Sequence, residues 1–166
     1  MSASLLTPPR FRLAVAGDLE AIVRMLADDP LGATRERYAS PLPEAYRRAF
    51  EAIERDPNHE LIVAEDKDGA AIAVLQLIFT PHLTHQGGWR ATVEGVRVDA
   101  RHRGAGLGRQ LFARAIERAR ARGCHQLQLS TDKQRPKAKR FYEQLGFVAT
   151  HEGMKLKLDL ATQVVG

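Results

Sequence analysis

Three alternating glycines in a basic setting are the feature of this chain that most clearly suggests chemistry. Gly104, Gly106 and Gly108 follow a predicted strand and open a predicted helix. Glycine lets the backbone approach a ligand closely, and a helix start offers unpaired N–H groups at its positive end. Four arginines lie in or beside this turn: Arg97, Arg101, Arg103 and Arg109. The combination predicts a site for a phosphate-bearing cofactor.

Two common phosphate-binding motifs do not fit this glycine turn. A dinucleotide-binding fingerprint needs the spacing G-x-G-x-x-G and an acidic residue about 20 positions later, and residues 124–130 contain no acid. A P-loop ends in G-K-[ST], whereas Gly108 is followed by Arg109. The pattern that remains is R-x-x-G-x-G. A tight turn without a ligand would require fewer glycines and arginines than this.

A second motif lies further along the chain, on a predicted helix that runs into a strand. It reads Phe141-Tyr142-Glu143-Gln144-Leu145-Gly146-Phe147. By itself this is an ordinary amphipathic helix end closed by a glycine. The motif becomes specific through its spacing from the glycine turn, because one predicted helix and one predicted strand separate the two.

Together the two motifs resemble those of the GCN5-related N-acetyltransferase (GNAT) superfamily. Its cofactor motif, R-x-x-G-x-G/A, matches Arg103-Gly104-Ala105-Gly106-Leu107-Gly108, and a tyrosine followed by E-x-x-G-F matches Tyr142 to Phe147. The order of predicted elements agrees over nearly the whole chain. The resemblance implies that acetyl-coenzyme A is the donor and that its acetyl group is transferred directly to an amine.

The resemblance also implies which residues hold the cofactor. In such proteins the strand before the turn and the strand after the next helix splay apart, and the pantetheine arm lies in the gap, paired with the first strand. Many relatives carry an asparagine at the position of Arg135, so Arg135 and Lys139 are expected to reach the cofactor's phosphates instead; the alternative is a solvated basic face. The implied cofactor-binding residues are Val96, Val98, Arg103, Gly104, Ala105, Gly106, Leu107, Gly108, Arg109, Arg135 and Lys139.

Amine acetylation needs a base for the amine and an acid for the departing thiolate. An alkylammonium has a pKa of about 10, so at pH 7 some group must accept its proton. Tyr142 is the predicted acid, because a phenol is neutral at pH 7 and can donate; the alternative is a packed tyrosine beside the cofactor. Glu94 is the predicted base, on the strand face of Val96 and Val98 if the period is two. The alternative for Glu94 is a carboxylate that binds a cationic substrate or a neighbouring arginine.

Hydrophobic periodicity predicts the elements that position these residues. Strands are predicted at 11–15, 61–64, 71–79, 91–98, 125–130, 147–150 and 154–160, and helices at 19–26, 44–55, 107–122 and 135–145. The order predicts an α/β (mixed α+β) fold, in which a mixed sheet has helices on its faces. The resemblance implies that this sheet is mostly antiparallel, with six to seven strands, and is flanked by about four helices. The resemblance adds a splay between the strands at 91–98 and 125–130. Residues 1–9 are predicted as a flexible tail and 10–164 as a single acetyltransferase domain.

The charge is unevenly distributed along this chain of 166 residues with a net charge of +5. Residues 101–140 hold 12 lysines and arginines but only 2 acids, which suggests a polyanionic partner. A phosphorylated cofactor is favoured over nucleic acid, because no zinc-finger spacing, basic zipper or aromatic RNA-binding motif is present. No stretch approaches the roughly 18 apolar residues of a membrane span, and the N-terminus lacks a signal sequence. These features predict a cytoplasmic protein without a membrane partner.

Three further residues are candidates for other roles. His82 and His85 have the spacing H-x-x-H, but a metal needs more ligands than these, so no metal site is predicted. With Thr84 and Trp89 they are expected to line the acceptor pocket. The single cysteine, Cys124, is expected to be a small buried strand residue rather than a nucleophile.

The expected acceptor is the primary amine of a small molecule. Residues 127–142 are similar to aminoalkylphosphonate-type members of the superfamily. One alternative is acetylation of a protein N-terminus or lysine, which needs an open groove rather than a closed pocket. Others are a non-catalytic acyl-CoA-binding sensor and a nucleic-acid-binding module. The resemblance also allows a homodimer.

Overall fold

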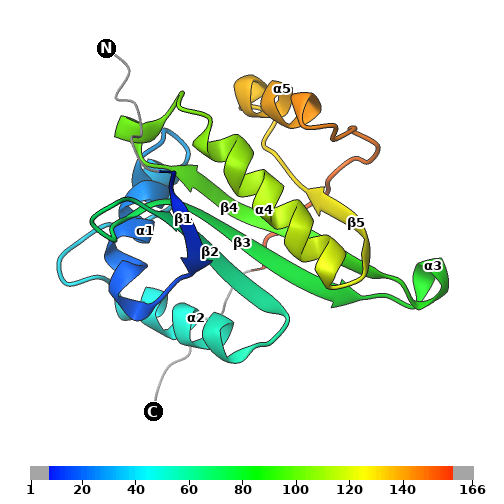
Figure 1. The fold of residues 1–166 in the computed structure, drawn as a ribbon, viewed down its shortest axis with the longest axis horizontal. Helices are drawn as coiled ribbons and strands as arrows, with labels where there is room; N and C mark the ends of the chain where they lie inside the picture. Colours follow the sequence, from blue (N-terminus) through cyan, green and yellow to red (C-terminus); the bar gives the residue numbers. More distant parts are fainter. Residues whose placement is uncertain (1–7, 159–166) are drawn as a thin grey trace. The chain divides into compact units, whose positions relative to one another are not determined.

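The computed structural model describes residues 8–158, which fall into one compact unit up to Leu129 and a second from Ser130 onward. We describe each unit by itself. The first contains β1 (Arg10–Leu13), η1 (Ala16–Asp18), α1 (Leu19–Ala27), η2 (Gly32–Thr34), α2 (Glu44–Arg55), β2 (His59–Glu65), β3 (Ala71–Pro81), α3 (Thr84–Gly87), β4 (Trp89–Val98), η3 (Ala100–His102), α4 (Leu107–Ala121) and β5 (Cys124–Leu129) (Figure 1). The second contains α5 (Pro136–Gln144). No helix among the described residues is long and apolar enough to span a bilayer.

The sheet of the first unit has the order β1-β2-β3-β4-β5. Consecutive strands from β1 to β4 are antiparallel, whereas β4 and β5 are parallel. A parallel pair needs a crossover connection, and α4 supplies it. The prediction of a mixed, mostly antiparallel α/β fold is confirmed.

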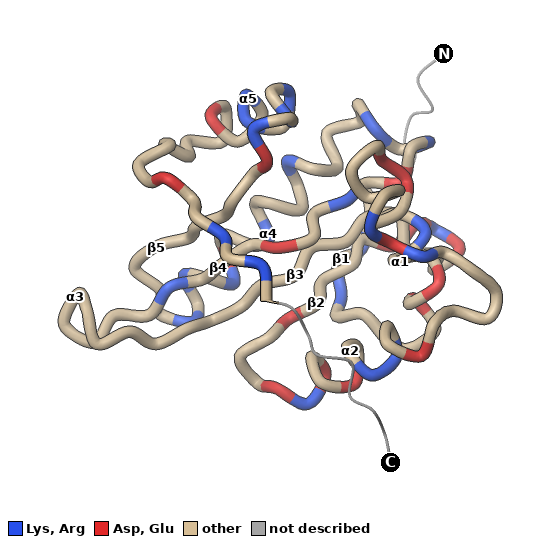
Figure 2. Tube along the Cα trace, turned by 180° about the vertical axis from the view of Figure 1, so that it is seen from behind, with Lys and Arg blue, Asp and Glu red and all other residues tan. Residues whose placement is uncertain are grey.

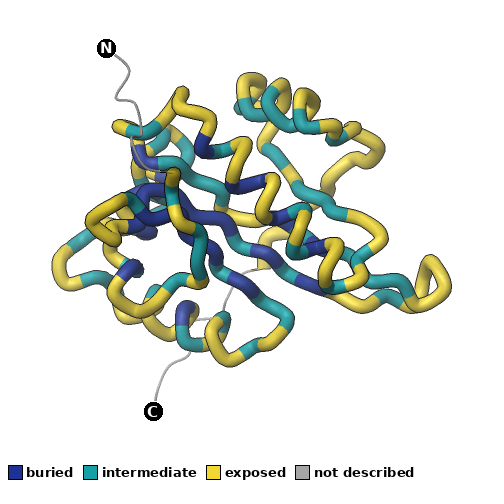
Figure 3. The backbone as a smooth tube through the Cα atoms, in the orientation of Figure 1, coloured by how far each residue is buried: buried dark blue, intermediate teal, exposed yellow. Residues whose placement is uncertain are grey.

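Helices cover both faces of this sheet. α4 turns one buried stripe toward β3, β4 and β5: Leu107, Leu111, Phe112, Ala115 and Ala119. On the other face, Ile22 and Met25 of α1 pack with Val63 and Val74. Burial on both faces explains the almost uninterrupted apolar run of β3. Figure 3 shows the buried segments concentrated in the central strands and along α4.

β4 contains a bulge. Four of its residues, Glu94 to Arg97, lie opposite three residues of β3, Val74 to Gln76. Gly95 within it has a φ of +59°, in the left-handed region that glycine adopts without a steric penalty. A bulge bends its strand and increases the local twist. β4 therefore changes direction between its first and second halves.

The bulge also changes which side chains share a face. Glu94 lies opposite Gln76, whereas Val98 lies opposite Ala73, on the other face of β3. The prediction that Glu94 and Val98 share a face is therefore wrong. Alternation with period two holds only in a regular strand, and the extra residue of the bulge reverses it.

Pairing between β4 and β5 stops where the bulge begins. It runs from Trp89–Cys124 to Val93–Leu129, so within the described residues the second half of β4 lacks a β5 partner. A straight parallel neighbour cannot follow a strand that bends away. The predicted divergence of these two strands thus begins at Val93.

The sheet has five strands in the described residues, not the six to seven predicted. Residues 147–158 form no strand, and residues 159–160 lie outside the described part. The apolar side chains whose alternation suggested strands here are exposed: Val148, Met154, Leu156 and Leu158. Alternation of apolar side chains shows only that a strand could bury one of its faces. A strand forms only if its backbone N–H and C=O groups also find a neighbouring strand to bond.

Candidate functional site

The glycine turn connects β4 to α4 through the short helix η3. Gly104 and Gly106 have φ angles of +81° and +79°, and Gly106 is the N-cap of α4. Left-handed residues alternating with others aim successive N–H groups into one concavity. The first N–H groups of α4, which has 15 residues, lack intrahelical partners. The turn thus presents a row of backbone donors at the positive end of a helix.

The space in front of this turn is open. A Cβ atom placed on Gly104 or Gly106 would meet nothing within 4 Å. Internal packing therefore does not require glycine at these positions, whereas the left-handed backbone does. An exposed row of N–H donors, with open space at the Cβ positions of both glycines, fits the pyrophosphate of a coenzyme A.

The arginines of the turn differ in how they are engaged. Nε of Arg103 donates to the Val98 carbonyl (3.1 Å), and its guanidinium lies 3.2 Å from an Asp28 carboxylate oxygen. Arg97 is largely buried in an ion pair with Asp29 (3.0 Å). Figure 2 shows basic and acidic segments side by side at this end of the sheet. Arg109 is exposed on the first turn of α4. Arg97 therefore has a structural role, and a phosphate would share Arg103 with Asp28.

Asp99 anchors the start of the turn. Its buried carboxylate accepts hydrogen bonds from the backbone N–H and from Nε of Arg101, both at 3.0 Å, and lies 3.3 Å from Arg24. Hydrogen bonding from the Arg101 side chain is the main reason that the pKa of Asp99 falls from 3.8 to about 2. The charged form is therefore the one that stabilises the fold.

We expect Asp99→Asn to lower the free energy of unfolding at pH 7 by about 1–3 kcal/mol, because it leaves charged donors with a neutral partner. The folded-state pKa lies below the unfolded value, so this contribution is present above pH 3.8 and is lost as the pH falls toward 2. Denaturant unfolding at pH 7 and pH 3 measures both effects. Asp68→Asn, in an exposed hairpin, is the control. Equal losses in the two variants would contradict the anchoring role.

The second half of β4 carries three of the predicted site residues. Val96 and Val98 are half-buried, and Glu94 is exposed. Because β5 pairs only with the first half of β4, the backbone at Val96 and Val98 is not paired with β5. The structure thus brings Glu94, the two valines and the glycine turn together along one continuous segment.

A polar row crosses the sheet on the face of Glu94. Gln76 lies directly opposite Glu94, and its side-chain amide donates to Nδ1 of His59 (3.0 Å). Next along β4, Thr92 accepts a hydrogen bond from Gln128 of β5 (3.2 Å). These residues place polar hydrogen-bonding groups beside the candidate base, as recognition of a polar acceptor requires.

The sequence analysis missed this row. Gln76 is the only polar residue between Ala71 and Phe79, and a lone polar residue in a buried strand was the available signal. Its neighbours His59, Thr92 and Gln128 come from three other strands. Their grouping depends on strand register, which one segment does not reveal.

The second unit carries the remaining predicted residues. Tyr142 lies on α5, half-buried, with ring contacts to Phe141 (5.6 Å) and Phe147 (6.1 Å). Arg135 precedes α5 as its N-cap, and Lys139 pairs with Glu143 at 3.8 Å. The order of these residues on one short helix agrees with the sequence analysis.

The two predicted histidines lie between β3 and β4, and Cys124 is the first residue of β5, opposite Trp89. His85 stacks near His125 of β5, with ring centroids 5.0 Å apart, and His82 contacts the Thr80 carbonyl. Burial raises the pKa of the Cys124 thiol, which lowers the thiolate fraction that a nucleophile needs. This supports a structural role for Cys124.

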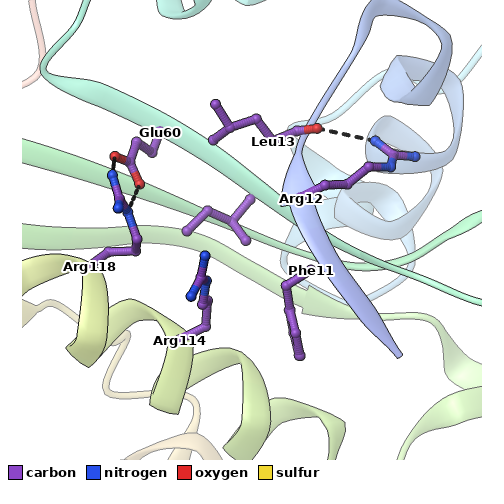
Figure 4. A pocket seen from close by; sticks show the side chains of 7 residues that line it. Phe11, Arg12, Leu13, Glu60, Arg114 and Arg118 are labelled. Carbon is purple, nitrogen blue, oxygen red and sulfur yellow. Dashed lines mark hydrogen bonds and ion pairs between the residues drawn. The ribbon is translucent and has the colours of Figure 1, made fainter. Parts of the chain in front are cut away.

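A separate hollow of about 170 Å³ lies between β1 and α4. Figure 4 shows Phe11 and Leu13 on one side of it, with Arg114 and the Arg118–Glu60 ion pair on the other. None of the predicted site residues lines it. It belongs to the packing between β1 and α4, on the face opposite to Glu94.

Comparison with known proteins gives two kinds of match. The model of the acetyltransferase (GNAT) family matches residues 21–147. A glucosamine 6-phosphate N-acetyltransferase from Oryza sativa subsp. japonica is 33% identical over 123 residues, which cover 70% of this chain and 73% of that protein. An aminoalkylphosphonate N-acetyltransferase from Salmonella typhimurium is 33% identical over 108 residues, 65% of this chain and 69% of that protein.

Among solved structures, a protein from Bacillus halodurans C-125 described as a transcriptional regulator is 58% identical to this chain. The match covers 91% of this chain and 100% of that one, with a TM-score of 0.88. The fold described above is therefore shared with an experimentally determined structure over almost its whole length.

Proposed function

Because the chain belongs to the acetyltransferase (GNAT) family, we propose that it transfers the acetyl group of acetyl-coenzyme A directly to the primary amine of a small molecule. The glycine turn carries this proposal: two left-handed glycines with open space before them lie at the start of a long helix. Both relatives named above act, by their names, on small molecules that join an amine to a phosphoryl group. Their names support a small acceptor over a peptide.

In this proposal the backbone holds most of the cofactor. The N–H groups from Gly104 to Gly108 bind the pyrophosphate, and Arg109 adds a charge beside them. The edge of β4 at Val96 and Val98 pairs with the pantetheine arm. Arg103 contributes when it turns from Asp28, and Arg135 and Lys139 are the proposed further phosphate contacts. Bound acetyl-coenzyme A supplies a thioester that is reactive toward amines.

The proposed step forms one C–N bond and breaks one C–S bond. The amine nitrogen attacks the thioester carbonyl, whose oxygen is polarised by the N–H of Val98. Glu94, which is exposed to water, accepts the amine proton directly or through a water molecule. Tyr142 gives a proton to the departing sulfur, so that free coenzyme A and the acetylated amine leave.

We expect Tyr142→Phe to lower kcat by about tenfold. General acids often contribute 10²- to 10⁴-fold, but a thiol has a pKa of only about 8.5, so its thiolate leaves with little help. Steady-state kinetics at saturating substrates measure this effect. Tyr46→Phe is the control, because that hydroxyl bonds Glu36 and the Arg37 N–H. Full kcat in Tyr142→Phe would exclude the acid role.

Calorimetric titration with acetyl-coenzyme A, followed by measurement of thiol release, tests the function as a whole. The amine panel contains aminoalkylphosphonates, polyamines, aminoglycosides, amino acids and short peptides. We expect binding, and thiol release with one class of small amine. Thiol release with peptides alone would show that the acceptor is a protein or peptide and not a small molecule. Absence of binding would overturn the proposed role of the glycine turn.

A second candidate is a regulator that binds acetyl-coenzyme A without turnover. It is favoured by the description of the 58% identical Bacillus halodurans protein as a transcriptional regulator. Binding without thiol release from any amine would support it. A regulator without turnover does not need a base such as Glu94, so we rank the transferase function above it.

A further inference from the structure

Arg90, near the start of β4, is half-buried and has no acidic partner among the described residues, whereas the half-buried Arg12, Arg97 and Arg118 each pair with a carboxylate. Its Nε is buried and has no hydrogen-bond partner among residues 8–158. One terminal nitrogen lies 3.5 Å from the Thr84 hydroxyl, the limit of a hydrogen bond. By contrast, Arg118 pairs with Glu60 at 2.5 Å. A buried N–H donor without a partner is costly, and the rest of this half-buried guanidinium group has no counter-ion among the described residues, so an anion bound here would satisfy both.

The surroundings of Arg90 favour an anion from outside the chain. Thr80 of β3 and Gln126 of β5 lie directly opposite it. Both are neutral, so neither neutralises the guanidinium group. Thr92, the next residue on this face, is also neutral and is bonded to Gln128. The face thus offers one positive charge with several neutral hydrogen-bonding groups around it.

The cofactor's pyrophosphate is too distant to be that anion. Arg90 precedes Val98 by eight residues, which corresponds to about 26 Å along an extended strand. The glycine turn lies beyond Val98, at the opposite end of β4. A pyrophosphate bound there would leave Arg90 unoccupied.

Glu94 lies on the same face as Arg90, because positions 90, 92 and 94 alternate regularly before the bulge. The separation of their Cα atoms is about 13 Å, and both side chains are long enough to reach into the space between them. A small molecule above Thr92 would contact Glu94 with one end and Arg90 with the other.

We propose that Arg90 binds an anionic group, a phosphate, phosphonate or carboxylate, of an amine acceptor whose amino group lies at Glu94. This inference rests on the proposed function, since it uses the same acceptor site. Arg90 would then select acceptors that carry an amine and an anion at a suitable spacing. A guanidinium group bonds such anions through two N–H groups at once.

Binding of three matched series of ligands tests the proposal. Aminoalkylphosphonates, aminoalkylcarboxylates and plain alkylamines of increasing chain length are titrated calorimetrically into protein saturated with coenzyme A, which occupies the glycine turn. We expect an anionic amine of one length to bind wild-type protein about 10- to 100-fold more tightly than the plain amine. The better of the two anionic series identifies the anion.

Arg90→Gln should abolish this preference, and Arg90→Lys should restore part of it because the charge returns. Arg120→Gln, an exposed arginine of α4, removes the same charge elsewhere and should leave the preference unchanged. Equal binding of anionic and plain amines by wild-type protein, or a preference that survives in Arg90→Gln, would overturn the proposal. So would failure of every amine to bind.

Thiol release from the same ligands separates this proposal from the proposed function. Acetylation of plain and anionic amines at equal kcat/KM would refute the anion-binding role of Arg90 but would support the proposed transferase function. Loss of anionic-amine binding in Arg90→Gln without acetylation of any amine would support the anion site and refute the transferase.

Discussion

Gly106→Val is expected to weaken acetyl-coenzyme A binding by more than about 100-fold. The valine side chain would occupy the open space where the pyrophosphate is proposed to lie, and each lost charge-assisted hydrogen bond costs about 1.5–3 kcal/mol. Two such bonds account for the expected loss. Position 106 also has a φ of +79°, and a β-branched residue is strained there. Calorimetric titration of the folded variant measures the effect.

Gly123→Val is the matched control for this experiment. Gly123 follows the other end of α4 with a φ of +72°, and nothing lies within 4 Å of its added Cβ. The two substitutions therefore impose similar backbone strain, but only one lies in the turn. We expect comparable decreases in melting temperature and a loss of affinity in Gly106→Val alone. Unchanged affinity in folded Gly106→Val would refute the pyrophosphate placement.

Glu94→Gln is expected to lower kcat by about 100-fold while the KM for acetyl-coenzyme A stays nearly unchanged. Glutamine keeps the shape of the side chain and its place opposite Gln76 but accepts no proton. The loss should shrink as the pH rises toward the amine pKa of about 10, because the acceptor then arrives neutral and needs no base. The pH dependence of kcat in both proteins measures this.

The control for Glu94→Gln is Glu117→Gln, on the exposed side of α4, where Glu117 pairs with Arg114. We expect wild-type kinetics from it. The split between kcat and KM distinguishes the two roles considered for Glu94. A raised KM for the amine with unchanged kcat would make Glu94 a binding group for the ammonium, and parallel pH profiles would exclude it as the base.

Elements with strong local signals were predicted well. The amphipathic helix at 107–122 and the helix at 44–55 differ from α4 and α2 by at most one residue at either end. Helical periodicity and a closing glycine act within one segment, so the segment alone carries the signal. The strands predicted after residue 146 depend instead on pairing with another strand, which no local pattern reveals. Their alternation was visible in the sequence, but whether a neighbouring strand pairs with them was not.

The residues of the candidate site also fall into those that local sequence predicts and those that depend on strand register. The glycine turn is a local structure, since positive φ angles and a helix start depend on residues adjacent in the chain. Glu94 and its neighbours are not local. The bulge at Gly95 decides which face Glu94 occupies. A glycine inside a strand often marks a bulge, and the prediction of regular alternation over 91–98 did not use that signal.

The sequence by itself therefore determined the family, the glycine turn and the order of the elements, because short-range conformational preferences encode them. Only the tertiary structure decided that Arg97 and Arg103 meet Asp29 and Asp28, that Gln76 lies beside Glu94, and that Arg90 has no acidic partner among the described residues. These contacts join segments far apart in the chain. They depend on strand register and on how α1 packs, which arise only when the hydrophobic core forms.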